Sequence, residues 1–170
     1  MRSALVLGGS GMLAGCAERL VARGWRVVLP CRTQPLMADD GPGRAARASL
    51  ARGHRPTWVR ADWGKPRELA AEVGYELAGH PVNLLVAWVH ESYRTAVLTA
   101  VAPLLAEHAP VVEVHTSAPV PDPVLAEHPT QQVLIGHFPH DAARHTGQAV
   151  LDAVVRALEG KPPSLHQAGG

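Results

Sequence analysis

The 170-residue chain has little lysine, little cysteine and few aromatic side chains. Lysine occurs only as Lys65 and Lys161, so a catalytic lysine has few places to be. Two cysteines, Cys16 and Cys31, are too few for a disulfide framework and predict reduced thiols in a cytoplasmic protein. No apolar run is long enough to span a bilayer. The formal net charge of +1 favours neither nucleic acid nor a membrane as partner, which leaves a small-molecule substrate.

The remaining composition is that of a globular protein. Hydrophobic residues make up 46% of the chain, which predicts a substantial core in one domain over residues 1–160. Residues 161–170 are expected to form a flexible tail. Residues 13–16 also fit a lipoprotein cleavage box, but three glycines weaken the preceding apolar segment, and a helical pattern continues beyond Cys16. We therefore expect no secretion signal.

The most informative stretch is Ala4-Leu5-Val6-Leu7-Gly8-Gly9-Ser10-Gly11-Met12-Leu13-Ala14-Gly15. An apolar run ends at a glycine cluster, and an amphipathic pattern starts inside that cluster. This order predicts a buried strand, a tight turn and a helix N-terminus. Glycines let a ligand approach the backbone, and free N–H groups with the helix dipole favour a phosphate.

Apolar periodicity predicts alternating strands and helices along the whole chain. Strands are expected at 3–8, 25–29, 57–61, 82–89, 110–115 and 132–138. Helices are expected at 11–23, 43–52, 66–78, 91–107 and 146–159, with Pro103 kinking the fourth. This alternation predicts an α/β fold, a doubly wound, Rossmann-like sheet of five or six mostly parallel strands. Ligands of such sheets bind beyond the carboxyl ends of the strands.

Four places at predicted strand ends resemble the short-chain dehydrogenase/reductase family, in its atypical branch. Gly8, Gly11 and Gly15 resemble its glycine turn, although their spacing departs from the usual patterns. Cys31-Arg32 and Asp62-Trp63 follow the second and third strands, and Ala87-Trp88-Val89 ends the fourth, where the family has Asn-Ala-Gly. The resemblance implies a dinucleotide site formed by Gly8, Gly9, Ser10, Gly11, Met12, Leu13, Arg32, Asp62, Trp63 and Trp88.

Arg32 indicates which dinucleotide is preferred. An acidic residue at the end of the second strand binds the ribose 2′-OH of NAD, whereas an arginine accommodates the 2′-phosphate of NADP. We therefore predict NADP(H) as the cofactor, with NAD(H) as the second choice. The competing interpretation is an arginine that only faces solvent at a strand end.

The family's catalytic pair, a tyrosine followed four residues later by a lysine, is missing. Neither Tyr75 nor Tyr93 has such a lysine, and the expected helix is replaced by a proline-rich segment, as in a truncated relative. Ser117 matches the place of the family's serine. As substitutes we predict His90 or Tyr93 as proton donor, because a histidine with a pKa near 6.5 can deliver a proton at neutral pH. His115 and Thr116 lie beside Ser117 in the sequence.

Two functions stay open at this point. The first is a small NADP(H)-dependent oxidoreductase that reduces a C=O or C=N group of a small metabolite. The second is a non-catalytic NAD(P)-binding protein that acts as a sensor or partner subunit. A homodimer through the apolar helix at 91–107 is predicted for either function.

The remaining histidines and cysteines give weaker indications of function. His137, His140 and His145 lack tetrahedral ligand spacing, so no metal is predicted; they are expected at the crevice or on the surface. Cys16 is expected in the core, and Cys31 as a small filler beside the adenosine site.

Overall fold

A computed structural model describes residues 2–8, 12–32, 55–135 and 142–168. Its centre is one sheet of seven strands in the order β3-β2-β1-β4-β5-β6-β7, and every neighbouring pair is parallel. The strands are β1 (Ser3–Leu7), β2 (Arg26–Cys31), β3 (Thr57–Arg60), β4 (Leu84–Ala87), β5 (Val111–His115), β6 (Thr130–Ile135) and β7 (Leu165–Ala168). The predicted doubly wound α/β fold is confirmed.

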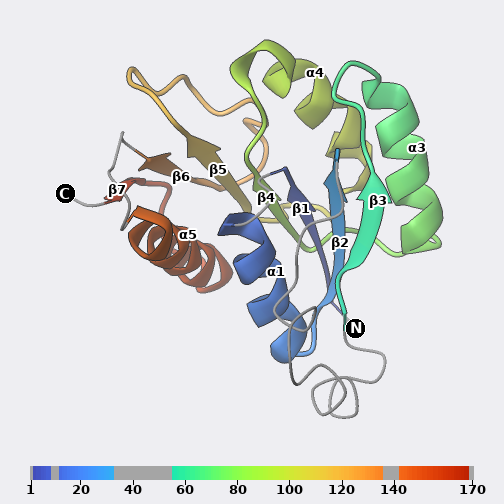
Figure 1. The fold of residues 1–170 in the computed structure, drawn as a ribbon, viewed down its shortest axis with the longest axis horizontal. Coiled ribbons are helices and arrows are strands. Elements are labelled where there is room, and N and C mark those ends of the chain that lie inside the picture. The colour runs from blue at the N-terminus through green and yellow to red at the C-terminus, as the bar shows by residue number, and fades with distance from the viewer. Residues whose placement is uncertain (1, 9–11, 33–54, 136–141, 169–170) are drawn as a thin grey trace.

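Helices cover both faces of the sheet (Figure 1). They are α1 (Met12–Ala22), α3 (Pro66–Leu77), α4 (Glu91–Val101) and α5 (Ala142–Leu158). One buried apolar cluster joins the sheet to α1 and α5, and a second joins its other face to α3 and α4. Among the described residues, no helix is both long and apolar enough to cross a membrane.

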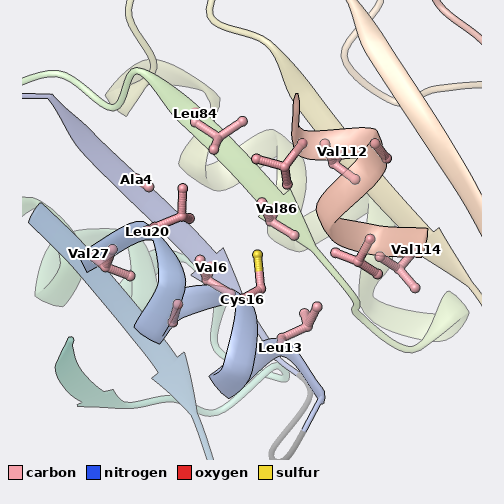
Figure 2. Packing of buried hydrophobic residues seen from close by; sticks show 14 of the residues in the cluster. Ala4, Val6, Leu13, Cys16, Leu20, Val27, Leu84, Val86, Val112 and Val114 are labelled. Carbon is pink, nitrogen blue, oxygen red and sulfur yellow. The ribbon is translucent and has the colours of Figure 1, made fainter. Parts of the chain in front are cut away.

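The apolar pattern of β1 and α1 explains how the first unit packs. Along β1, Ala4 and Val6 face α1, whereas Leu5 and Leu7 face the opposite cluster, so the strand is apolar throughout. The predicted face of α1 is buried; Figure 2 shows Leu13, Cys16 and Leu20 of this face pointing at the sheet. This packing aims the N-terminus of α1 at the carboxyl edge of the sheet.

Two predicted boundaries next to prolines are wrong. β2 continues through Pro30 to Cys31, because the Pro30 carbonyl oxygen accepts the Gly8 N–H at 3.2 Å, which requires no donor from proline. The helix predicted over 91–107 ends at Val101 and passes into a 3-10 turn, Ala102–Leu104, because Pro103 cannot continue an α-helix. The helix predicted over 43–52 lies outside the described residues.

The C-terminal end differs most from the prediction. The sheet has seven strands where five or six were expected, and part of the predicted flexible tail forms β7. Gln131 of β6 explains why: its side-chain amide donates to the carbonyl oxygens of Lys161 and Pro162, at 3.2 and 2.8 Å. These hydrogen bonds hold the chain that leads into β7. The sixth strand, β6, is parallel to both of its neighbours.

Candidate functional site

Gly8 lies where the order of strands reverses. β1 and β4 are neighbours in the sheet although β2 and β3 separate them in the chain, so the crevice at their carboxyl ends is the expected ligand site. Gly8 has φ +80°, and a Cβ on it would lie 2.1 Å from the Trp88 carbonyl oxygen. Only glycine fits this close approach. Trp63 is also adjacent, because its Cζ2 lies 3.7 Å from the same point.

The rest of the predicted glycine turn is only partly described. Gly9, Ser10 and Gly11 lie outside the described residues, and so does the side chain of Met12. The Leu13 side chain is buried in the core, so this residue has only its backbone to offer a cofactor. Because α1 begins at Met12, its first N–H groups lack helical partners and lie at the crevice.

A hollow of about 790 Å³ opens on one side of Gly8, at the ends of β2 and β3. Arg32 and Asp62 both line it, as the sequence predicted for an adenosine site; Arg60 and Lys65 add two cations, and Glu68, Glu72 and Glu76 add three carboxylates. Arg32 is exposed. One carboxylate oxygen of Asp62 accepts the Gly64 N–H at 2.9 Å, which holds the side chain at the start of the turn. Trp63 is not part of the lining; it packs against the cluster below α3 and α4.

A second hollow, of about 460 Å³, opens on the other side, at the ends of β4 and β5. Trp88, His90 and Ser117 line it, together with Arg94 and His115. His90 caps α4, where its Nδ1 accepts the Ser92 N–H at 3.2 Å, so a neutral His90 carries its proton on Nε2. The structure therefore brings two of the three predicted catalytic side chains together.

Tyr93, the third predicted catalytic residue, does not line this hollow. Its ring centroid is 6.3 Å from that of His90, and its side chain packs partly buried against the cluster below α4. Since Tyr93 follows His90 by three residues on one helix, the two rings are neighbours, but only His90 faces the open space.

Arg94 and Glu113 form a buried ion pair that the sequence interpretation missed. The Nε and Nη2 atoms of Arg94 contact Glu113 Oε1 at 2.7 and 2.6 Å, and Nη2 also donates to the Asp122 carbonyl oxygen at 2.8 Å. Burial raises the pKa of Glu113, and Arg94 acts against this rise. A charged residue inside the apolar strand sequence Val-Val-Glu-Val-His was the signal that could have revealed it.

The side chain of His115 is buried, unlike that of His90. Burial lowers its pKa to about 4, and the neighbouring Arg94 charge adds to the shift, with Glu91 acting weakly in the opposite direction. His115 is therefore neutral at physiological pH. An imidazole with this pKa does not carry the extra proton that an acid near pH 7 needs.

The segment between β5 and β6 contains no helix, as the prolines predicted. Residues 116–129 form an irregular linker of bends and a turn, with Val124 and Leu125 packed against the cluster below α4. Arg94 holds it through Asp122, and the Gln132 side chain donates to the Pro121 carbonyl oxygen at 2.9 Å. The helix that would carry a Tyr-Lys pair is thus replaced by a polar-anchored linker.

Solved structures of other proteins share this architecture. A double mutant of a short-chain dehydrogenase/reductase from Serratia marcescens matches with a TM-score of 0.66 at 14% identity, covering 99% of this chain and 97% of that chain. A carbonyl reductase from Pseudomonas aeruginosa, in complex with NADP, matches with a TM-score of 0.63 at 15% identity and the same coverage. The fold is that of the short-chain dehydrogenases/reductases. A scan of protein-family models and a search of curated proteins give no match.

Within this short-chain dehydrogenase fold, the remaining candidates have structural roles or lie outside the described part. Cys16 is buried in the core, where burial raises its pKa to about 12, and Cys31 is buried with a raised pKa. Neither thiol is part of a disulfide bond. No cluster of metal-ligating side chains occurs among the described residues. His137 and His140 lie outside them, as does the side chain of His145.

Proposed function

We propose that the protein binds NADP(H) along the carboxyl edge of the sheet and uses it to reduce a C=O or C=N group of a small metabolite. The observation that carries this proposal is the pair of hollows on either side of Gly8. A dinucleotide is an extended ligand with a charged centre. The N-terminus of α1 lies between the hollows and suits the pyrophosphate, and each hollow can take one nucleoside end.

Arg32 supports NADP(H) rather than NAD(H). It is exposed at the end of β2, and it lines the larger hollow with Asp62, Arg60 and Lys65. A 2′-phosphate would pair with Arg32 at the end of β2, where NAD-preferring proteins carry an acidic residue that binds the ribose 2′-OH. The cofactor named with the Pseudomonas carbonyl reductase is also NADP.

His90 is the proton donor that this geometry favours over Tyr93. When bound, NADPH would supply a hydride; its addition to a C=O carbon leaves an anionic oxygen that takes up a proton, and its addition to a protonated C=N group leaves a neutral amine. His90 donates as the charged ring, from Nε2, the nitrogen turned away from Ser92; the second proton, on Nδ1, replaces the contact with the Ser92 N–H. It lines the hollow with Ser117, whose hydroxyl can bind the substrate oxygen. His90 then recovers a proton from solvent, because it is exposed.

A non-catalytic dinucleotide-binding protein is the second candidate. The irregular linker over residues 116–129 favours it, because this linker replaces the helix on which the family carries its catalytic pair. Such a protein would keep the adenosine hollow and respond to occupancy without turnover.

Calorimetric titration with NADPH and NADH, followed by a turnover screen, separates these functions. The reductase predicts NADPH binding and oxidation of NADPH by members of a panel of small aldehydes, ketones and cyclic imines. Binding without turnover across the panel would support the sensor. A protein that binds neither dinucleotide would contradict both.

The homodimer predicted through residues 91–107 is part of this proposal. One side of α4 is exposed and would form the contact; it includes Glu91, Thr95 and Thr99, which are spaced one helical turn apart. Light scattering at several protein concentrations measures the mass, and a monomer with full NADPH affinity would remove the dimer.

A further inference from the structure

The buried end of the smaller hollow contains a hydrogen-bond network whose protons can be assigned. Gln132 of β6 donates from Nε2 to the Pro121 carbonyl oxygen at 2.9 Å. A carbonyl oxygen only accepts, so this contact fixes which end of the Gln132 amide carries the hydrogens. The same nitrogen lies 3.3 Å from His115 Nε2.

This contact determines the tautomer of His115. Because the Gln132 nitrogen is a donor, His115 Nε2 must be the acceptor and carries no proton. A neutral imidazole has one proton, so that proton lies on Nδ1. Arg94 on α4 and the sheet around His115 disfavour a second proton on the ring, while Glu91 favours it only weakly.

The Nδ1–H group is available to a ligand. Within the described part of the chain it has no hydrogen-bond partner, and it is not among the fully buried atoms that lack one. His115 is one of the residues that line the hollow, beside Ser117. Since the opposite ring nitrogen is turned to Gln132, Nδ1 is the polar atom that His115 offers to this space.

We propose that His115, held by Gln132, is a fixed hydrogen-bond donor to the substrate oxygen and selects carbonyl over imine substrates. This inference rests on the proposed reductase function. Hydride addition to C=O builds negative charge on oxygen, which an oriented N–H group stabilises. The reactive form of an imine is the iminium ion, which carries an N–H of its own and has no lone pair to accept the His115 donor.

Two substitutions and one control test the role of His115 in turnover. His115→Leu removes the donor, and we expect carbonyl reduction to lose about 100-fold in kcat, the usual scale for one oxyanion donor. NADPH affinity should stay within about twofold, because the adenosine hollow is untouched. His115→Asn returns an N–H near the Nδ1 position and should recover part of the loss. His80→Gln, at an exposed loop, is the control.

The tautomer itself is measured without turnover. Nitrogen-15 spectra of the histidine rings, with His115 identified by its absence in His115→Asn, should show a protonated Nδ1 and a bare Nε2 between about pH 6 and 8. A proton on Nε2, or a charged ring over this range, would overturn the inference. This readout needs no cofactor and covers the case that His115→Leu fails to fold.

The outcomes distinguish the two proposals. If the wild-type protein reduces neither carbonyls nor imines, the reductase function fails and the substrate assignment fails with it. If it reduces carbonyls and His115→Leu keeps kcat within about threefold, only the role of His115 fails. Equal losses on carbonyl and imine substrates would likewise remove the selectivity, since the donor should matter for oxygen alone.

Discussion

The two halves of the sheet are built differently. In the half formed by β1, β2 and β3, the strand interiors are apolar, and the helix α1 provides the crossover from β1 to β2. In the half formed by β5, β6 and β7, an irregular linker connects β5 to β6, and buried polar side chains are frequent. Apart from Ser3, the described buried polar residues lie on α4, β5 and β6: Arg94, Glu113, His115, Thr130 and Gln131.

The difference shows what a linker needs in order to replace a helix. A helix buries an apolar stripe and forms hydrogen bonds between its own backbone groups. An irregular segment leaves backbone carbonyl groups that need donors from elsewhere. Arg94 and Gln132 supply these donors to Asp122 and Pro121. The same two side chains also contact Glu113 and His115, of which His115 lines the smaller hollow. The linker and the proposed reaction site therefore depend on one polar network.

The largest expected effect comes from breaking this network at Arg94. Arg94→Met leaves the Glu113 carboxylate buried without its partner and should cost about 3–5 kcal/mol of unfolding free energy. Without Arg94, the native state keeps Glu113 protonated at a pH where the unfolded chain has released the proton. Stability of the variant should therefore fall as pH rises from about 5 to about 8, which urea unfolding at several pH values measures.

Arg67→Met, on the exposed side of α3, is the matched control and should leave stability unchanged. If Arg94→Met does not fold, the double variant with Glu113→Gln should recover folding, because no uncompensated charge remains. An Arg94→Met protein as stable as wild type would contradict the idea that this half depends on the ion pair.

A substitution at Gly8 tests the stability of the other half of the sheet. Gly8→Ala places a Cβ against the Trp88 carbonyl oxygen and holds alanine at φ +80°. We expect a loss of about 2–4 kcal/mol from the positive φ and the overlap together, and NADPH binding should be lost as well. Gly79→Ala is the control: φ is +85°, but nothing lies within 4 Å. Equal thermal unfolding of both variants would show that the close approach of β1 and β4 does not matter.

Arg32→Ala tests the cofactor preference of the first half. Removing one charge-assisted contact to the 2′-phosphate should weaken NADPH binding about 10–100-fold and leave NADH binding nearly unchanged. Stability should not change, because Arg32 is exposed. Calorimetric titration of both dinucleotides gives the comparison; parallel losses for the two would mean that Arg32 does not read the 2′ position.

The smallest effect is expected at the attachment of β7. The Ser164 hydroxyl donates to Gln131 Oε1 at 2.7 Å, and His166 Nε2 contacts the same oxygen at 3.0 Å. Ser164→Ala should cost about 0.5–1.5 kcal/mol, the scale of one hydrogen bond. Gln167→Ala, an exposed position of the same strand, should cost less. Hydrogen exchange of the β6 and β7 amides locates the effect; unchanged protection would show that β7 is held by its backbone pairing alone.

Local periodicity was enough to predict the first unit of the fold. The apolar run of β1, the glycine at its end and the buried face of α1 are all properties of a few consecutive residues. The same reasoning placed Arg32 and Asp62 at one hollow and His90 and Ser117 at the other, because the ends of parallel strands meet at one edge of a sheet.

Only the tertiary structure decided the partners of the buried polar groups. A pattern of apolar and polar residues reports which positions are buried, but not which distant side chain lies opposite each one. Arg94 and Glu113 are 19 residues apart, and His115 and Gln132 are 17 apart. Strand pairing and helix packing bring them together, and the same long-range pairing turns residues 165–168 into a strand. Sequence alone thus predicted most of the elements and the edge at which a ligand is expected, whereas the tertiary structure decided which polar and charged groups meet there.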